Sequence, residues 1–271
     1  MGDGRIIVTG GAGFIGSAVV WRLNELGYED ILIVDRLDET EKWKNLVPLR
    51  FADYLDADDL IEGFGGHTDV RAIIHMGACS STTETDADYM LHNNFKYTQG
   101  LADFAVACGI RFIYASSAAT YGDGSAGMED GTEGLNALRP LNIYGYSKQL
   151  FDQYAARNGM FDRIVGLKYF NVFGPNEDHK GDMRSLVNKA FEQINETGRL
   201  KLFKSASPEY EDGEFGRDFV YVKDTVDMTL HFLERDGGGL FNVGSGRMNT
   251  WNALADAIFK ALDRPLDVEF V

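Results

Sequence analysis

Short apolar runs alternate with amphipathic stretches through the first 170 residues of the chain. The apolar runs predict buried strands at 6–8, 31–34, 47–52, 72–75, 111–115 and 164–169. Apolar positions with helical spacing predict helices at 14–26, 86–107 and 144–157. Strands that alternate with helices indicate an α/β fold, in which helices cover both faces of a doubly wound parallel sheet through right-handed crossovers.

The alternation becomes less regular after Asn171. The pattern there predicts a helix at 183–196, a polar loop at 205–216, a strand at 219–222, a helix at 224–234 and a strand at 240–243. We therefore expect a second, smaller α/β domain that binds the substrate. The larger domain is expected to comprise residues 1–170 and 221–247, and the smaller one residues 171–220 and 248–271. Because the chain ends in a predicted strand just after Pro265, we expect the smaller domain to continue beyond Val271.

A glycine-rich turn joins the first predicted strand to the first predicted helix. Gly10, Gly13 and Gly16 allow a tight turn and let the backbone approach a pyrophosphate, while the helix start at Phe14 and Ile15 offers N–H groups and a partial positive charge. This context predicts a Rossmann-type dinucleotide site, so the larger domain is interpreted as the cofactor-binding domain.

The residues after the second strand leave the dinucleotide open. Asp35, 19 positions after Gly16, would accept a hydrogen bond from the ribose 2′-hydroxyl of NAD. Arg36 and Lys42 would instead hold the 2′-phosphate of NADP. Asp53, expected just after the third strand, is a candidate acceptor for the adenine amino group.

A tyrosine and a lysine lie four positions apart on a predicted helix, and therefore on one face. Free tyrosine has a pKa of about 10, which is too high for a general base at neutral pH. A neighbouring ammonium favours the phenolate, so Tyr144 and Lys148 together form a candidate proton acceptor. Ser117 is expected at the carboxyl edge of the sheet, where its hydroxyl would bind the reacting alcohol.

The chain resembles the extended short-chain dehydrogenases/reductases over nearly its whole length. The resemblance is carried by the strings TGGAGFIG at 9–16, YASSAATYG at 114–122, YGYSK at 144–148 and RDFVYV at 217–222. It implies that Ser117, Tyr144 and Lys148 are catalytic. It also implies that Arg217 holds the diphosphate of a nucleotide-linked sugar.

Two rarer strings are similar to those of one branch of this family, the ADP-heptose 6-epimerases. They are GACSSTTE at 77–84 and NVFGP at 171–175, the latter followed by HKG at 179–181. This resemblance implies a tightly held NADP with Arg36 and Lys42 at its phosphate, and an ADP-heptose substrate on the route to lipopolysaccharide core. It further implies inversion at C6 by transient oxidation, Lys180 as a second acid/base group, and a homo-oligomer, typically a pentamer.

The same resemblance extends the expected site. Further cofactor contacts are expected from Met76, Gly77, Ala78, Cys79, Ser80, Asn93, Val172 and Lys180, besides Tyr144 and Lys148. Substrate contacts are expected from Ser117, Asn171, Asp182, Lys189, Phe203, Lys204, Ser205, Ala206 and Arg217.

Composition narrows the alternatives. The formal charge of −16 argues against sequence-independent nucleic-acid binding, and no membrane span, targeting segment or metal-ligand spacing is visible, so we expect a cytoplasmic protein with two reduced, packed cysteines and no metal.

A hexose 4-epimerase would share the triad of Ser117, Tyr144 and Lys148 without requiring Lys180. Dehydratases of the family carry Asp-Glu where Ala118 and Ala119 stand here. A non-catalytic NAD(P) sensor would not need the Tyr144/Lys148 pair.

Overall fold

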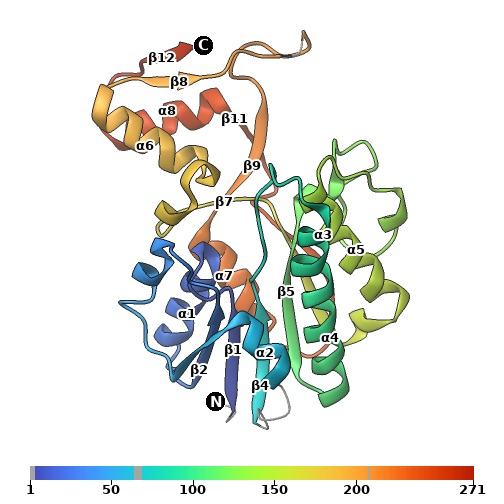
Figure 1. Ribbon diagram of the computed structural model, residues 1–271. Helices are drawn as coiled ribbons and strands as arrows, with labels where there is room; N and C mark the ends of the chain where they lie inside the picture. The colour runs from blue at the N-terminus through green and yellow to red at the C-terminus, as the bar shows by residue number, and fades with distance from the viewer. Residues whose placement is uncertain (1–3, 64–68, 207) are drawn as a thin grey trace. The chain divides into compact units, whose positions relative to one another are not determined.

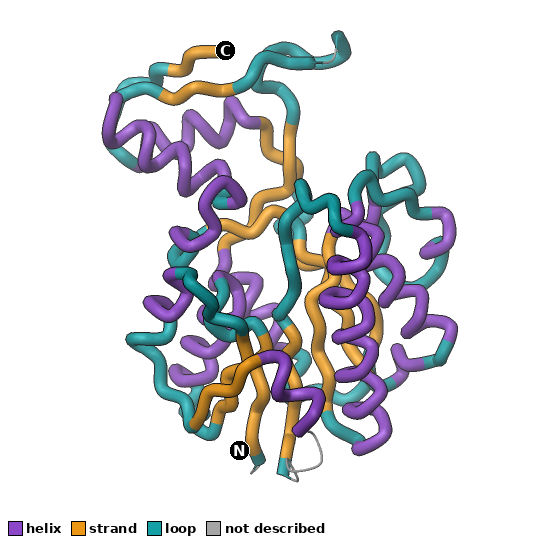
Figure 2. Tube along the Cα trace, in the orientation of Figure 1, coloured by secondary structure: helices purple, strands orange, loops and turns teal. Residues whose placement is uncertain are grey.

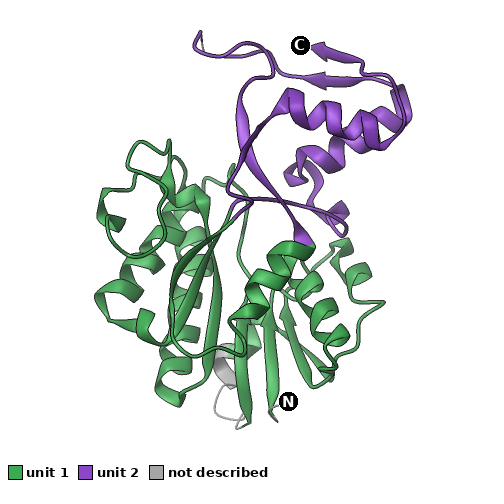
Figure 3. Cartoon of the chain, turned by 180° about the vertical axis from the view of Figure 1, so that it is seen from behind, with its two compact units in different colours: residues 1–169, 223–243 green, residues 170–222, 244–271 purple. Residues whose placement is uncertain are grey.

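The computed structural model describes residues 4–63, 69–206 and 208–271. The chain divides into two compact units, coloured separately in Figure 3. Unit 1 comprises Met1–Tyr169 and Lys223–Val243, and unit 2 comprises Phe170–Val222 and Gly244–Val271. The roles predicted for the two domains, cofactor binding and substrate binding, stay predictions at this point.

Unit 1 contains a seven-stranded parallel sheet in the order β10-β6-β5-β4-β1-β2-β3 (Figure 1). Its strands are β1 (Arg5–Thr9), β2 (Ile31–Asp35), β3 (Asp53–Asp56), β4 (Val70–His75), β5 (Arg111–Ser117), β6 (Ile164–Tyr169) and β10 (Gly239–Val243). Its helices are α1 (Phe14–Glu25), α2 (Ala57–Gly63), α3 (Ala87–Met90), α4 (Tyr97–Cys108), α5 (Ile143–Arg157) and α7 (Val222–His231), the last of which begins at the boundary. The predicted doubly wound fold is confirmed.

Figure 2 shows helices packed beside the strands of the large sheet, and buried apolar side chains on the strands explain this arrangement. On one face, Ile7, Leu32 and Phe112 pack in a single core with residues of α2, α4 and α5. Residues adjacent to these in the strands point to the opposite face. There α1 and α7 contact each other through an ion pair of 2.8 Å between Arg22 Nε and Asp227 Oδ1. The central strands therefore lose water contact on both faces, as a parallel sheet requires.

The third strand was predicted in the wrong place. Residues 47–52 form a turn and a segment without regular secondary structure, and Val47 is 72% exposed, so the apolar residues there do not mark a buried strand. The strand is Asp53–Asp56 at the sheet edge, where backbone pairing with β2 holds a polar sequence. Asp53 thus begins the strand instead of following it, and Asp56 is the residue level with Asp35 at the carboxyl edge.

The helical stretch predicted at 86–107 is present but is not uniform. Asp86 caps α3 by accepting a hydrogen bond of 2.9 Å from the Tyr89 N–H. A π-helical segment, Leu91–Lys96, then separates α3 from α4. Such segments insert an extra residue into a helical turn and are frequent at functional sites. Here the segment contains Asn93, one of the predicted cofactor residues.

Unit 2 is a smaller α/β unit, also as predicted. The strands β7 (Asn171–Phe173), β9 (Gly216–Tyr221) and β11 (Met248–Thr250) form one sheet in the order β11-β9-β7, and β8 (Leu200–Leu202) pairs with β12 (Val268–Phe270). The helices α6 (Leu186–Thr197) and α8 (Trp251–Ala261) share an apolar core that includes Ile194, Leu202 and Phe259.

Two smaller expectations can be compared with the structure. Both cysteines are free, but Cys108 is exposed and Cys79 only partly buried, so the expectation of packed cysteines was wrong. Within the described residues, no helix has the length and apolar character needed to cross a bilayer.

Candidate cofactor and catalytic site

The glycine-rich turn has the close backbone approaches that its sequence predicts. Gly10 has φ +66°, and a Cβ there would lie 2.6 Å from the backbone nitrogen of Gly77. A Cβ on Gly16 would lie 2.0 Å from the Gly10 carbonyl oxygen. The N-cap of α1 is Gly13, which makes no side-chain cap, and the first turn carries no acidic residue. The positive end of the helix is therefore not neutralised by its own side chains, which suits an anionic ligand.

The carboxyl end of β2 carries a network of charges. The Asp35 carboxylate accepts hydrogen bonds from the Ala12 N–H at 2.9 Å and from Lys42 Nζ at 2.8 Å. Arg36 forms an ion pair with Asp58 and donates to Asn93 Oδ1 at 2.7 Å. The sequence pattern did not indicate Asp58, which accepts from Arg36 across 22 positions of the chain.

The loop after β4 is fixed against the glycine turn and the π-helical segment. Met76 N–H donates to the Thr9 carbonyl at 3.0 Å, and Gly77 packs against Gly10. Asn94 is 1% exposed; it exchanges two hydrogen bonds of 2.9 Å with the backbone of Cys79 and donates to Ser147 Oγ at 3.1 Å. Asn94, which sequence reasoning missed, therefore ties the predicted cofactor loop to α5.

Ser117, Tyr144 and Lys148 lie together at the carboxyl edge of the large sheet. Ser117 ends β5, and its hydroxyl lies near enough to Tyr144 to influence the pKa of that phenol. Its oxygen also accepts a hydrogen bond of 3.1 Å from the Ala119 N–H. The Asn142 side chain caps α5 by accepting from the Gly145 N–H at 2.8 Å, which fixes the helix start beside Ser117. The three predicted catalytic residues of unit 1 are thus brought together.

Burial dominates the electrostatics of this group. Burial raises the pKa of Tyr144, and the nearby Ser117 hydroxyl only partly opposes that change. Burial lowers the pKa of Lys148 to about 8, and its ammonium donates to the Ala115 carbonyl at 2.8 Å. Lys148 is directed at the Ala115 carbonyl, and the lowering of the pKa of Tyr144 expected from Lys148 together with the charge of the cofactor stays a prediction. A phenolate at Tyr144 requires further positive charge.

In unit 2, a loop carrying Lys180 is closed by one buried carboxylate. Glu177, which is 0% exposed, accepts hydrogen bonds from the Gly174 N–H at 3.0 Å, the Ser185 N–H at 2.6 Å and the Ser185 hydroxyl at 2.7 Å. Burial lowers the pKa of Lys180, and Glu177 opposes that change. Asp182, on the same loop, is exposed. Sequence reasoning did not single out Glu177.

The remaining predicted residues of unit 2 lie on separate elements. Asn171 begins β7 and donates to the Asp218 carbonyl at 3.2 Å, while Lys189 lies on α6. The segment 203–206 follows β8, and the Phe203 side chain is 78% exposed. Arg217 of β9 stacks its guanidinium 4.3 Å from the ring centre of Phe215.

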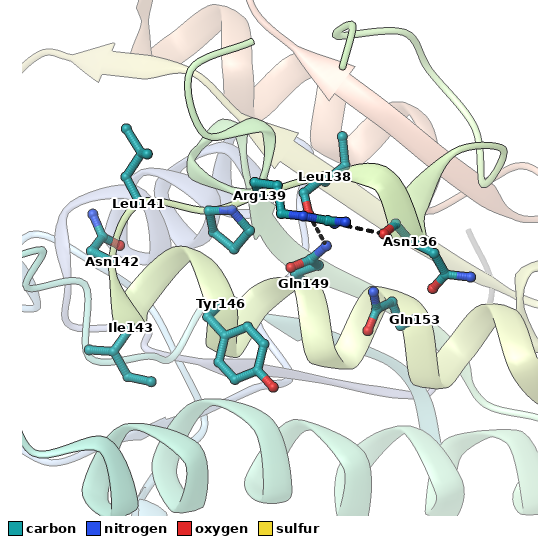
Figure 4. Close-up of a pocket in the computed structure, with 10 residues that line it drawn as sticks. Asn136, Leu138, Arg139, Leu141, Asn142, Ile143, Tyr146, Gln149 and Gln153 are labelled. Carbon is teal, nitrogen blue, oxygen red and sulfur yellow. Dashed lines mark hydrogen bonds between the residues drawn. The ribbon is translucent and has the colours of Figure 1, made fainter. Parts of the chain in front are cut away.

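A surface hollow of about 520 Å³ lies along the start of α5 (Figure 4). Figure 4 shows Tyr146, Gln149 and Gln153 of the helix below Arg139 and Leu141 of the preceding loop. Gln149 donates to the Leu138 carbonyl at 3.1 Å and holds that loop in place. Among the described residues, its lining includes none of the predicted site residues.

Comparison with known proteins gives a consistent assignment. The model of the NAD dependent epimerase/dehydratase family matches residues 6–244. The ADP-L-glycero-D-manno-heptose-6-epimerase of Nitratidesulfovibrio vulgaris (strain DP4) is 54% identical over 269 residues, covering 98% of this chain and 83% of that protein. The protein of the same name from Fusobacterium nucleatum subsp. nucleatum is 49% identical, covering 94% of this chain and 79% of that protein.

Solved structures show the same relationship. The crystal structure of ADP-L-glycero-D-manno-heptose-6-epimerase from Helicobacter pylori has a TM-score of 0.85 at 25% identity, over 99% of this chain and 84% of that one. UDP-glucose 4-epimerase from Thermotoga maritima, with UDP-glucose, has a TM-score of 0.76 at 27% identity, over 98% of this chain and 85% of that one. Because the family model spans most of the chain and the identities are high, the chain belongs to the NAD dependent epimerase/dehydratase family.

Proposed function

We propose that the chain interconverts the two C6 epimers of ADP-glycero-D-manno-heptose, in the synthesis of lipopolysaccharide core precursors. The observation that carries the proposal is the group Ser117, Tyr144 and Lys148 in a chain 54% identical to an epimerase of that name. The hydrogen at C6 is not acidic, so proton abstraction alone cannot invert that carbon. Oxidation to a ketone, followed by hydride return to the other face, can.

The turn around Gly10 and Gly16 suits a nicotinamide dinucleotide. A side chain at either position would collide with neighbouring backbone, so the tight turn that approaches a pyrophosphate requires glycine there. When bound, such a cofactor accepts a hydride from C6 and returns it. Tyr144 would take the hydroxyl proton as the alcohol is oxidised, while Ser117 would donate a hydrogen bond to the substrate oxygen. The positive charges of Lys148 and the oxidised nicotinamide would together favour the Tyr144 phenolate.

Lys180 is proposed as the acid/base group for the second epimer. Burial lowers its pKa, and that shift makes a neutral amine more accessible near neutral pH. A proton delivered from a group other than Tyr144 would allow the ketone to be reduced from its opposite face. The alternative is a lysine that only stabilises a polar loop.

The cofactor is proposed to be NADP, with NAD as the alternative. Lys42 compensates the charge of Asp35, the carboxylate that would otherwise serve the ribose of NAD. Arg36 adds a second positive charge at the same strand end, and its acidic partner Asp58 is 72% exposed and therefore readily solvated. Two cations around a neutralised carboxylate favour a 2′-phosphate.

A homo-oligomer is proposed on the family resemblance alone. Sedimentation velocity of the purified protein would test it, and we expect a species with the mass of about five chains. A monomer at all accessible concentrations would contradict it.

The function is tested by denaturing the purified protein, identifying the released dinucleotide and incubating fresh protein with each ADP-heptose epimer. We expect NADP(H) and inversion at C6 from either side. UDP-glucose serves as the rival substrate, and its conversion to the 4-epimer in place of heptose inversion would favour a hexose 4-epimerase. Bound dinucleotide without any turnover would favour a sensor.

The residue roles are tested with Tyr144→Phe and Lys180→Met. Loss of a general acid/base group costs roughly 10²- to 10⁴-fold in rate, so both variants should lose at least the lower figure from either epimer. Tyr146→Phe, on the same helix at the hollow, and Lys201→Met, an exposed lysine of β8, are the matched controls. If Lys180→Met stays near wild type in both directions, the two-base scheme fails.

A further inference from the structure

A fully buried carboxylate that the proposed mechanism does not use lies below the catalytic group. Asp152 of α5 is 0% exposed. Its Oδ1 accepts a hydrogen bond of 2.7 Å from the Tyr114 hydroxyl, and its Oδ2 accepts one of 2.7 Å from the Ser116 hydroxyl. Both donors belong to β5, the strand that ends at Ser117. Two short hydrogen bonds of this kind stabilise an ionised carboxylate away from water.

Two buried lysines lie on the elements that surround this carboxylate. Lys168 of β6 is 1% exposed, with Nζ 3.8 Å from Asp152 Oδ2 and 4.1 Å from the ring centre of Tyr121. Lys148 is 4% exposed and precedes Asp152 by one helical turn, on the same face of α5. Asp152 therefore forms an ion pair with Lys168 and lies one helical turn from Lys148, whose own ammonium donates to the Ala115 carbonyl. Charges this deeply buried are costly unless they compensate one another.

We propose that Asp152 and Lys168 are positioning residues that set the charge of Lys148: the carboxylate keeps the Lys148 ammonium protonated, and Lys168 limits how strongly it does so. The proposal rests on the proposed function in one respect, because it gives Lys148 its role beside Tyr144. The pair acts through Lys148 and needs no contact with substrate or cofactor.

The directions of the pKa shifts agree with this geometry. Burial lowers the pKa of Lys148 to about 8, and Asp152 raises it. Burial also lowers the pKa of Lys168 and raises that of Asp152, while each opposes the shift of the other. The other titratable groups that interact with these lysines are Cys79 and His75 around Lys148, and Asp130 near Lys168. Burial lowers the pKa of His75 to about 3, so His75 is neutral in this range.

The test is the pKa of Lys148, read by NMR titration of the full chain labelled at the lysine ε-carbon. The Lys148 signal is assigned by its loss in Lys148→Arg. Asp152→Asn should lower the pKa of Lys148 by roughly one unit or more, because a nearby opposite charge is removed. Lys168→Met should raise that pKa, because Asp152 then interacts with Lys148 alone. The alkaline limit of the rate profile should move in the same two directions.

Opposite signs separate this proposal from a merely structural role, which would lower activity without moving the pKa of Lys148. Tyr154→Phe, which removes a hydrogen bond to Asp103 at the far end of α5, is the matched control and should leave that pKa unchanged. Shifts of the same sign in Asp152→Asn and Lys168→Met, or no shift in either, would overturn the proposal.

The double variant Asp152→Asn/Lys168→Met covers the case in which Asp152→Asn does not fold, since replacing a whole buried ion pair is tolerated better than breaking it. The pKa of Lys148 in the double variant should lie below the pKa of Lys148 in Lys168→Met. Equal values in the two variants would also refute the proposal. Because the titration needs no substrate, it tests the role of Asp152 and Lys168 separately from the proposed function. Opposite shifts in a protein that does not invert ADP-heptose would refute only the proposed function.

Discussion

A methyl group added at Gly16 tests whether the glycine turn is required by the fold as well as by the cofactor. The Cβ of an alanine there would lie 2.0 Å from the Gly10 carbonyl oxygen and 3.0 Å from the Gly11 Cα. The first of these distances falls about 1.4 Å short of ordinary van der Waals contact. Both neighbours are backbone atoms, so no side chain can rotate away and the turn itself must shift.

The cost follows from two opposing effects. Overpacking of a well-packed site costs ~1–3 kcal/mol, and so large an overlap with backbone belongs at the upper end. Alanine gains about 1 kcal/mol over glycine inside a helix. We therefore expect Gly16→Ala to lower the free energy of unfolding by about 2 kcal/mol. We also expect it to weaken dinucleotide binding, because the shifted turn no longer follows the pyrophosphate.

Gly13→Ala is the matched control in the same turn. Its Cβ would lie 3.2 Å from the Gly10 oxygen, and Gly13 has φ −73°, which any residue adopts. Unfolding in urea, followed by tryptophan fluorescence, should show a loss of no more than about 1 kcal/mol for this N-cap change. Titration calorimetry with NADP gives the affinity. A Gly16→Ala variant that is as stable as wild type would refute the reasoning from close contact.

Three further predictions concern pH, the cofactor and the Lys180 loop. Burial lowers the pKa of His75 from 6.5 to about 3, so the folded state stays neutral while the unfolded state gains a proton. The free energy of unfolding should therefore fall by ~1.4 kcal/mol per pH unit from pH 6.5 downward, and urea titrations should show a smaller slope in His75→Gln. Arg36→Ala should weaken NADP binding roughly 10- to 100-fold and leave NAD binding nearly unchanged, measured by calorimetry beside Arg50→Ala; equal losses for both cofactors would contradict the phosphate role. Glu177→Gln should destabilise its loop by ~1–3 kcal/mol, because an amide cannot accept all three hydrogen bonds of the carboxylate. Hydrogen exchange of that loop should then become faster, and unchanged exchange would show that the carboxylate is not needed there.

The sequence predicts the large sheet well because burial controls its strands. The five residues of β2 are all buried, so an unbroken apolar run marks that strand. The edge strand β3 is polar and half exposed, and only backbone pairing with β2 holds it, so hydrophobicity drew the prediction to 47–52. The π-helical segment at Leu91–Lys96 was missed for a related reason, because its hydrogen-bond register leaves no mark in the apolar spacing.

The candidate site was predictable where its residues are close in sequence. Tyr144 and Lys148 share a helix face at a spacing that can be read directly. Asp152 accepts from Tyr114 across 38 positions, so its role depends on the fold of two distant segments. A signal was nonetheless present: Asp152 stands between the buried residues Phe151 and Ala155, at a helical position that should hold an apolar side chain. An acid in that position indicates a buried partner.

The chain passes between the two units three times, near residues 169, 222 and 243, and this has a consequence for biosynthesis. Strand β10 completes the large sheet by pairing with β6, but it is translated only after the 53 residues of unit 2 that run from Phe170 to Val222. A nascent chain on the ribosome therefore presents an open sheet edge at β6 until β10 emerges, and an exposed edge of this kind is a site for wrong pairing. Neither unit corresponds to a contiguous fragment that could be cloned alone. Isolating unit 1 would require a designed connection from Tyr169 to Lys223.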